Sequence, residues 1–300
     1  MDLTLNCIVL ISALTAATGG PVALDNGKIR IELDTRTFSV RFLGEPGGRN
    51  FLEPMHLTPS ELDGEGWIEP GGVVTDVLPV QQDNAVIRRG PAEMIERSDD
   101  YILLLGPEEP RSRWRVKKEV QLARDTAELT YKVTVLSSMK EERDVRIRNT
   151  ARIAWSGRLL IPVDAGPLKL VRGRFEGLER MLKYPEGSFV LPLYSTSIRS
   201  RAVLASPAPE VTMSTDFGVW TRRLEIQSAP EEPEFENREG MMALLDDETH
   251  IYESALEGAQ SGVNVGAPLV VIEHWTIGPP VGTPVRKEPA DDEVVVEELP

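Results

Sequence analysis

Short runs that alternate apolar and polar residues recur from about Gly27 to Gly278, and this rhythm constrains the fold more than any other feature. A period of two residues is typical of a β-strand with one buried face, and helical spacing is nearly absent between the runs. Roughly 16 to 18 such runs predict an all-β protein, a large two-sheet antiparallel β-sandwich. The clearest runs are KIRIELD at Lys28–Asp34, TFSVRFL at Thr37–Leu43, RWRVKKEVQL at Arg113–Leu122 and ELTYKVTVL at Glu128–Leu136. Among the other runs, Asn84–Arg89 and Leu269–Ile277 are also expected to be strands.

The two ends of the chain depart from this rhythm. Residues 1–20 contain an apolar stretch, Cys7–Leu14, followed by small residues, which resembles a secretory signal peptide. Residues 280–300 are rich in proline and acidic residues, a composition that favours a flexible tail. We therefore expect a signal peptide at 1–20, a single β-domain at 21–279 and a tail at 280–300. With a signal the protein is periplasmic or secreted; the alternative is a cytoplasmic location.

Charge and composition narrow the classes of partner. The formal net charge is −15, and binding to nucleic acid or to an anionic membrane surface needs clustered Lys and Arg. Apart from the stretch Cys7–Leu14, no apolar run approaches the 18 or more residues of a membrane-spanning helix. Cys7 is also the only cysteine, so a chain without its leader has no disulfide. We expect no nucleic-acid partner and no membrane span.

Motifs for cofactors, metals and nucleophilic serine are missing from the sequence. No P-loop and no G-x-G-x-x-G stands between a strand and a helix, and no serine has a G-x-S-x-G context. The three histidines, His56, His250 and His274, do not stand in a metal-binding spacing such as H-x-H or H-E-x-x-H. The sequence therefore predicts neither a cofactor nor a metal site.

A long irregular segment, Gly44–Gly72, interrupts the strand pattern. It holds seven glycines and four prolines, and loops of this length inside a compact domain are often functional. Trp67 lies in it and is a candidate for stacking on a sugar ring; the alternative is that its ring only pins the loop down. His56 lies in the same loop and would suit acid–base work near neutral pH beside a carboxylate.

Two glutamates near the end of the domain form a candidate pair. Glu253 and Glu257 lie four residues apart in an extended segment, so their side chains point to the same face. Paired carboxylates divide the roles of acid and base when their surroundings differ. In a chain with 48 Asp and Glu, a pair of solvated surface acids is the alternative interpretation.

An arginine row is the second candidate feature. Arg146, Arg148 and Arg152 share one face of a predicted strand. On a concave sheet they would bind the carboxylates or sulfates of an acidic glycan. On a solvated outer face they would pair with neighbouring acids instead.

Two segments of the chain resemble a known fold family. Trp114–Val163, with its R-N-T…W order, and Ile251–Ile277, with its L-E-G…P-L…E-H-W order, are similar to the galactose-mutarotase-like supersandwich, most closely its DUF4380-type branch. The resemblance implies a β-supersandwich and a sugar-related function. In sugar mutarotases a glutamate of the Leu-Glu segment is the general base, and it corresponds here to Glu257. Their Asn-His dipeptide stands here as Asn149-Thr150.

Three function classes follow from these observations. The first is a sugar-active enzyme, an epimerase, mutarotase or lyase that uses Glu257 with a histidine or an arginine. The second is a carbohydrate-binding protein without catalysis, which uses the concave face and Trp67. The third is a structural protein of the envelope. An enzyme needs a second titratable group that converges with Glu257 in one cleft.

Overall fold

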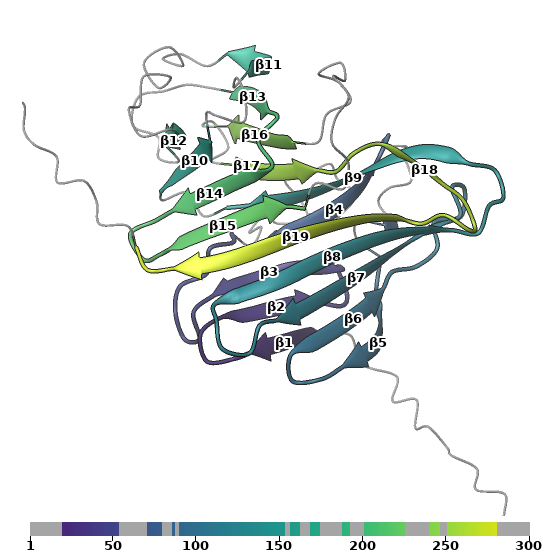
Figure 1. The fold of residues 1–300 in the computed structure, drawn as a ribbon, viewed down its shortest axis with the longest axis horizontal. Coiled ribbons are helices and arrows are strands. Elements are labelled where there is room, and N and C mark those ends of the chain that lie inside the picture. Colours follow the sequence, from purple (N-terminus) through teal and green to yellow (C-terminus); the bar gives the residue numbers. More distant parts are fainter. Residues whose placement is uncertain are drawn as a thin grey trace, which may run out of the picture.

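A computed structural model of the chain describes residues 20–53, 71–79, 86–87, 90–153, 157–162, 169–174, 188–192, 201–225, 240–246 and 251–280. Within these residues the protein consists of two antiparallel sheets packed face to face, which confirms the predicted all-β sandwich (Figure 1). None of the described segments forms a helix long and apolar enough to cross a membrane. The expected leader and tail lie outside the described residues, apart from Gly20 and Pro280.

The first sheet has ten strands. Nine follow the order β1-β2-β3-β4-β9-β17-β16-β13-β11, and β18 pairs with β9 beside β17. Their bounds are β1 Pro21–Asp25, β2 Arg30–Asp34, β3 Ser39–Gly44, β4 Val73–Leu78, β9 Arg143–Arg152, β11 Lys169–Arg174, β13 Arg201–Ser206, β16 Gly240–Asp246, β17 Ile251–Glu257 and β18 Ser261–Val263.

The second sheet has nine strands in the order β12-β10-β14-β15-β19-β8-β7-β6-β5. It forms the front layer of Figure 1, with the long strands β19, β8 and β7 at its centre. The bounds are β5 Glu93–Arg97, β6 Tyr101–Leu105, β7 Trp114–Leu122, β8 Glu128–Ser137, β10 Arg158–Pro162, β12 Ser188–Pro192, β14 Glu210–Ser214, β15 Val219–Leu224 and β19 Leu269–Gly278.

Alternation in the sequence accounts for the long strands. In β7, Trp114, Val116, Val120 and Leu122 are buried, while the residues between them are more exposed, apart from Lys118. β8 and β19 show the same alternation of buried and more exposed positions along most of their lengths. Because side chains of a strand point alternately to the two faces, the apolar set of each strand turns toward the other sheet.

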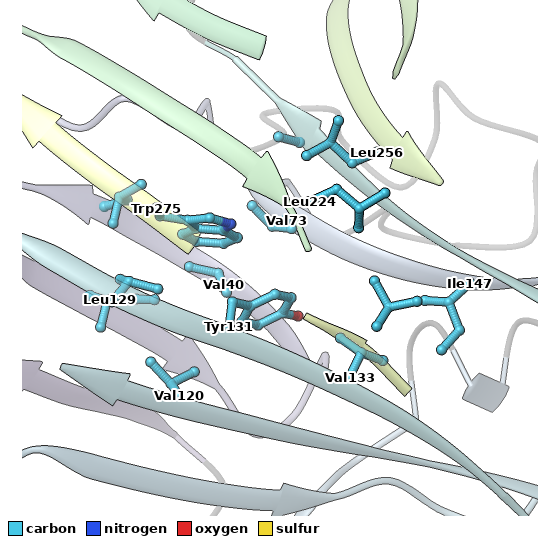
Figure 2. Close-up of a cluster of buried hydrophobic side chains, with 14 of the residues drawn as sticks. Val40, Val73, Val120, Leu129, Tyr131, Val133, Ile147, Leu224, Leu256 and Trp275 are labelled. Carbon is cyan, nitrogen blue, oxygen red and sulfur yellow. The ribbon is translucent and has the colours of Figure 1, made fainter. Parts of the chain in front are cut away.

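Apolar side chains from both sheets fill the space between them (Figure 2). Val40, Val73 and Ile147 come from the ten-stranded sheet, and Tyr131 and Trp275 come from the nine-stranded sheet. The rings of Tyr131 and Trp275 have centroids 4.8 Å apart, within the range of favourable aromatic pairs. The core is therefore continuous from one sheet to the other.

One predicted strand is wrong. A strand is expected at residues 84–89, of which the structure describes 86 and 87; these two are helical, and the carbonyl of Val86 accepts a hydrogen bond from the amide of Gly90 at 2.9 Å. Ile87 is 1% exposed. Ile87 is thus buried in helical backbone, whereas the sequence pattern assigns it to a strand.

The edge strand β5 differs from the strands beside it. All five of its residues are exposed, and its pairing with β6 is interrupted by a bulge between Met94 and Glu96. Glu93 and Glu96 pair with Leu105 and Leu103, which lie on the outer side of the sheet. A bulge and charged side chains are common on strands that end a sheet.

Gly72 sets the entry into β4. Its φ is +81°, and a Cβ atom at this position would stand 1.8 Å from the carbonyl oxygen of Val40. Only glycine fits so close an approach in this backbone conformation. Its carbonyl also accepts a hydrogen bond from the amide of Arg152 at 2.8 Å, so this glycine joins β4 to the end of β9.

Candidate functional site

The candidate site lies on the outer face of the ten-stranded sheet, the side turned away from the nine-stranded sheet. In β9, Ile147, Asn149 and Ala151 are buried toward the core, so Arg148 and Arg152 occupy the opposite face. Arg148 pairs in register with Asp76 of β4 on one side and with Glu257 of β17 on the other. Neighbouring strands therefore bring charges of opposite sign together.

Glu257 occupies the last position of β17 and is 6% exposed. Its Oε2 accepts a hydrogen bond from Nη1 of Arg146 at 3.2 Å, and its Oε1 accepts one from Nε of Arg148. Both arginines come from β9, so the carboxylate is held across the pairing of β9 with β17, which we call the seam. A carboxylate with a guanidinium group on each oxygen has a fixed orientation.

A second ion pair crosses the same seam. Nη2 of Arg152 donates to Oε1 of Glu253 at 2.9 Å, and both side chains are mostly buried. Glu253 and Glu257 are on one face, as their spacing predicts, but Glu257 is bound by two arginines and Glu253 by one. Thr150 and Ala255 lie opposite each other between the two pairs.

Burial distinguishes these pairs from ordinary surface ion pairs. The side chains of Arg146, Arg148 and Glu257 are 15%, 27% and 8% exposed. Exposed ion pairs contribute about 0–1 kcal/mol to stability, and desolvated charges persist only when they are paired. Planar carboxylate and guanidinium groups held at a partly buried face can bind a polar ligand through paired hydrogen bonds with little reorganisation.

The other predicted site residues are not brought to this face by the described structure. His56 and Trp67 lie outside the described residues. His274 lies on β19 and is exposed, whereas its neighbours Glu273 and Trp275 are buried, so it faces away from both as predicted. Its Nε2 lies 3.2 Å from Oε2 of Glu225, on the far side of the sandwich from the seam. In the described ranges, no group of three or more His, Cys, Asp or Glu side chains could hold a metal ion.

A buried polar network beneath the seam was not predicted. Its members are fully or almost fully buried: Thr75, Asn149, Arg222, Ser254 and Glu273. The sequence carried a signal for it, because these polar residues stand at positions where the strand alternation calls for apolar ones. Glu273, for example, lies between Val271 and Trp275 on the buried face of β19.

Lys118 of β7 is another polar residue at a position where the strand alternation calls for an apolar one, and it was not predicted to be buried. It stands between Val116 and Val120 on the buried face and is 1% exposed. Its Nζ donates to the carbonyl oxygen of Phe38 and lies 4.1 Å from the centroid of the Phe38 ring. Burial lowers the pKa of Lys118 from 10.5 to about 7, although the charge of Asp76 acts in the opposite direction.

Comparison with known proteins bears on the fold. No family model matches the sequence, and no curated protein matches it. Solved structures do resemble it. A candidate aldose 1-epimerase from Escherichia coli is 12% identical, covers 86% of this chain and 99% of its own, and has a TM-score of 0.57.

Two further structures agree with the first. A galactose mutarotase-like protein from Lactobacillus casei is 10% identical, covers 86% of this chain and 100% of its own, and has a TM-score of 0.53. A galactose mutarotase related enzyme from Lactobacillus acidophilus is 10% identical, covers 87% and 98%, and has a TM-score of 0.52. At such low identity the likeness concerns the fold alone. With its two antiparallel sheets in this arrangement, the chain has the galactose mutarotase-like fold.

Proposed function

We propose that this protein binds a carbohydrate on the outer face of the ten-stranded sheet, at the seam of β9 and β17. The observation that carries the proposal is the Glu257 carboxylate, which is almost fully buried on an outward face and held by Arg146 and Arg148. Sugar hydroxyl groups donate to carboxylates and accept from guanidinium groups. The fold of several mutarotase-related proteins supports a sugar over other polar ligands.

The charge of the sugar follows from the pairing of the arginines. The arginine row by itself favours an acidic glycan, because guanidinium groups bind carboxylates and sulfates. Glu257 and Glu253 already engage these arginines, so an acidic sugar would compete with carboxylates of the protein. The pairing therefore favours a neutral sugar, and the acidic glycan is the second ligand to test.

A sugar-active enzyme with Glu257 as general base is the second candidate function. It is supported by the position of Glu257 at the end of β17, where the resemblance to sugar mutarotases puts their base. His274 lies on the other sheet, so the acid partner of Glu257 in this proposal is His56 of the Gly44–Gly72 segment or an arginine of the seam. The matching activity is interconversion of sugar anomers, which is measured by the decay of optical rotation of a freshly dissolved aldose.

Three finer assignments remain proposals. The first is membership of the DUF4380-type branch, which rests on Trp114–Val163 and Ile251–Ile277 alone. The second is a periplasmic or secreted location, which rests on the leader-like residues 1–20. The third is the division of the chain into a leader, one domain at 21–279 and a tail.

The binding test compares Glu257→Gln with a matched control, Glu119→Gln. Glu119 lies on the outer face of the other sheet and is likewise held by two cations, Lys117 at 3.0 Å and Lys132 at 3.2 Å. A hydrogen bond to a charged group contributes about 1.5–3 kcal/mol, so Glu257→Gln should weaken sugar binding by about ten- to a hundredfold. Isothermal titration with neutral aldoses and with uronic acids measures the change.

The control should bind like the wild type. Equal affinity of both variants for every sugar bound by the wild type would contradict the placement of the site at Glu257. Anomer interconversion that is lost in Glu257→Gln, with the fold retained, would favour the enzyme. Binding that weakens without any catalysed interconversion in the wild type would favour the binding protein.

A further inference from the structure

We infer that Arg222 and Glu273, which belong to the nine-stranded sheet, form a buried clamp that positions the seam of the ten-stranded sheet. The inference rests on the proposed function, since the seam carries the candidate sugar site. Both residues are buried, with side chains 1% and 0% exposed. They are positioning residues, because they reach the site through the backbone of β9 and β17.

The guanidinium group of Arg222 binds one carbonyl of each seam strand. Its Nη2 donates to the carbonyl oxygen of Asn149 in β9 at 2.8 Å, and its Nη1 donates to the carbonyl oxygen of Ser254 in β17 at 2.9 Å. One rigid, planar group therefore fixes the distance between the two strands at this point. A lysine has a single nitrogen at its tip and lacks this fork.

Glu273 fixes the orientation of that guanidinium group. Its Oε2 accepts from Nε of Arg222 at 3.0 Å, and its Oε1 accepts from Nη2 at 3.1 Å. The indole Nε1 of Trp275 and the amide Nδ2 of Asn149 donate to the same carboxylate at 2.7 and 2.8 Å. The carboxylate cannot turn without breaking several charge-assisted hydrogen bonds at once.

The clamp extends to the third strand of the candidate site. The hydroxyl group of Thr75 in β4 donates to Oδ1 of Asn149 at 2.8 Å. β4 also carries Asp76, which pairs in register with Arg148. The network thus contacts β4, β9 and β17 from inside. The outward side chains of these same three strands include Asp76, Arg148 and Glu257.

The clamped peptide groups are direct neighbours of the site residues. Asn149 follows Arg148, and Ser254 follows Glu253. The outer ion pairs, Arg148 with Glu257 and Arg152 with Glu253, cross the same seam on the opposite face. Their geometry depends on the spacing and twist of the two strands, which the clamp holds from below.

Stability alone gives no reason for a charged clamp in this core. Apolar residues of similar volume often replace a buried ion pair with no loss of stability, since the pair costs desolvation. Fully satisfied polar networks contribute instead to one defined arrangement of the surrounding strands. Arg222→Met/Glu273→Leu leaves the indole of Trp275 and the side-chain amide of Asn149 without their acceptor. The prediction is therefore a folded but less stable protein whose site geometry is altered.

The test uses the full chain and reads the Nε–Hε resonance of Arg148 by nitrogen-15 NMR, assigned with Arg148→Lys. In the wild type this group donates to Glu257. In Arg222→Met/Glu273→Leu the resonance should shift by more than its line width or disappear through exchange with water. Where the double variant does not fold, Arg222→Lys takes its place, and the same shift is expected because lysine cannot bind both strands.

Glu109→Gln is the matched control, because Glu109 is also a buried carboxylate but binds the amides of Arg111 and Ser112 in the turn before β7. It should leave the Arg148 resonance in place. An unchanged Arg148 resonance in a folded clamp variant would overturn the inference, and so would an equal shift in the control. Sugar affinity is the second readout, with an expected loss of about tenfold in the clamp variant. Failure of the wild type to bind any sugar would count against the proposed function only, since the resonance does not depend on sugar.

Discussion

The core of this protein buries two cations in different ways. Arg222 lies against a carboxylate and two backbone carbonyls, and its hydrogen bonds engage all three of its nitrogens. Lys118 donates a hydrogen bond to the Phe38 carbonyl and lies over the face of the Phe38 ring. Burial lowers the pKa of Lys118 to about 7. Both cations replace an apolar residue at the buried face of a strand.

The difference shows two ways of tolerating a polar group away from water. A guanidinium group does not lose its proton in proteins, so Arg222 requires a buried counter-charge and a full set of acceptors. An amine can lose its proton, so Lys118 can lie in the core as a neutral group with one acceptor. Removal of a partner should therefore have a large effect at Arg222, and pH should have a large effect at Lys118.

The largest loss of stability is expected for Glu273→Leu. This substitution leaves the charge of Arg222 without its counter-ion in the core, and breaking a buried ion pair in this way costs about 3–5 kcal/mol. Urea denaturation at pH 7 measures the free energy of unfolding. Glu225→Leu is the control, because Glu225 is an exposed partner of His274 and its removal should change stability by about 0.5 kcal/mol or less. A loss below about 1 kcal/mol for Glu273→Leu would remove the distinction between the two cations.

The next effect is the pH dependence caused by Lys118. Its pKa is about 7 in the folded protein and 10.5 as a model value, so between these values the unfolded chain binds the additional proton. The free energy of unfolding should therefore rise with pH from 7 to about 10, by up to about 1.4 kcal/mol per pH unit from this group. Below pH 7 both states are protonated and the full penalty remains.

Lys118→Met should remove this penalty. The variant should be more stable than the wild type at pH 6–7, by about 1–3 kcal/mol after the loss of the bond to Phe38, and its advantage should fall as pH rises toward 10. Urea denaturation between pH 6 and 10 follows both proteins. Lys117→Met, on the opposite face of the same strand, should keep the wild-type pH dependence. An equal stability difference at pH 6 and at pH 10 would show that Lys118 is charged in the fold.

The smallest effect is expected for Thr75→Val, which removes one neutral hydrogen bond from the clamp. Oδ1 of Asn149 loses its donor, and the loss of one neutral hydrogen bond is expected to cost about 1 kcal/mol. Thr134→Val is the control, because the buried Oγ1 of Thr134 has no hydrogen-bond partner within the described structure. The control should be neutral or stabilising in thermal unfolding. Equal destabilisation by both substitutions would mean that the Thr75 bond adds nothing to the network.

Much of the fold follows from local alternation. The predicted run at Glu128–Leu136 differs from β8 by one residue, and Leu269–Ile277 differs from β19 by one residue. The facing of His274 away from Glu273 also follows from the period of two. In contrast, β11 and β16 were not predicted.

The site could be predicted only in part. The shared face of Glu253 and Glu257 follows from their spacing, but their engagement by arginines depends on which strand lies beside β17, and no local pattern specifies that neighbour. The clamp joins strands of two different sheets, and Arg222 and Asn149 are 73 positions apart in the sequence, so no local pattern predicts their contact. A polar residue at an apolar strand position is the one local sign of such a contact.

The bulged edge strand β5 bears on how copies of the protein behave in a concentrated solution. An edge strand can recruit the same strand of another molecule and extend the sheet. Two copies of β5 could pair antiparallel with their outer faces on the same side. Glu93 of one copy would then lie opposite Glu96 of the other. Like charges directly opposite each other on paired strands are destabilising. Met94 and Ile95 can thus remain exposed at the end of an open sheet, because the glutamates beside them oppose its growth from molecule to molecule.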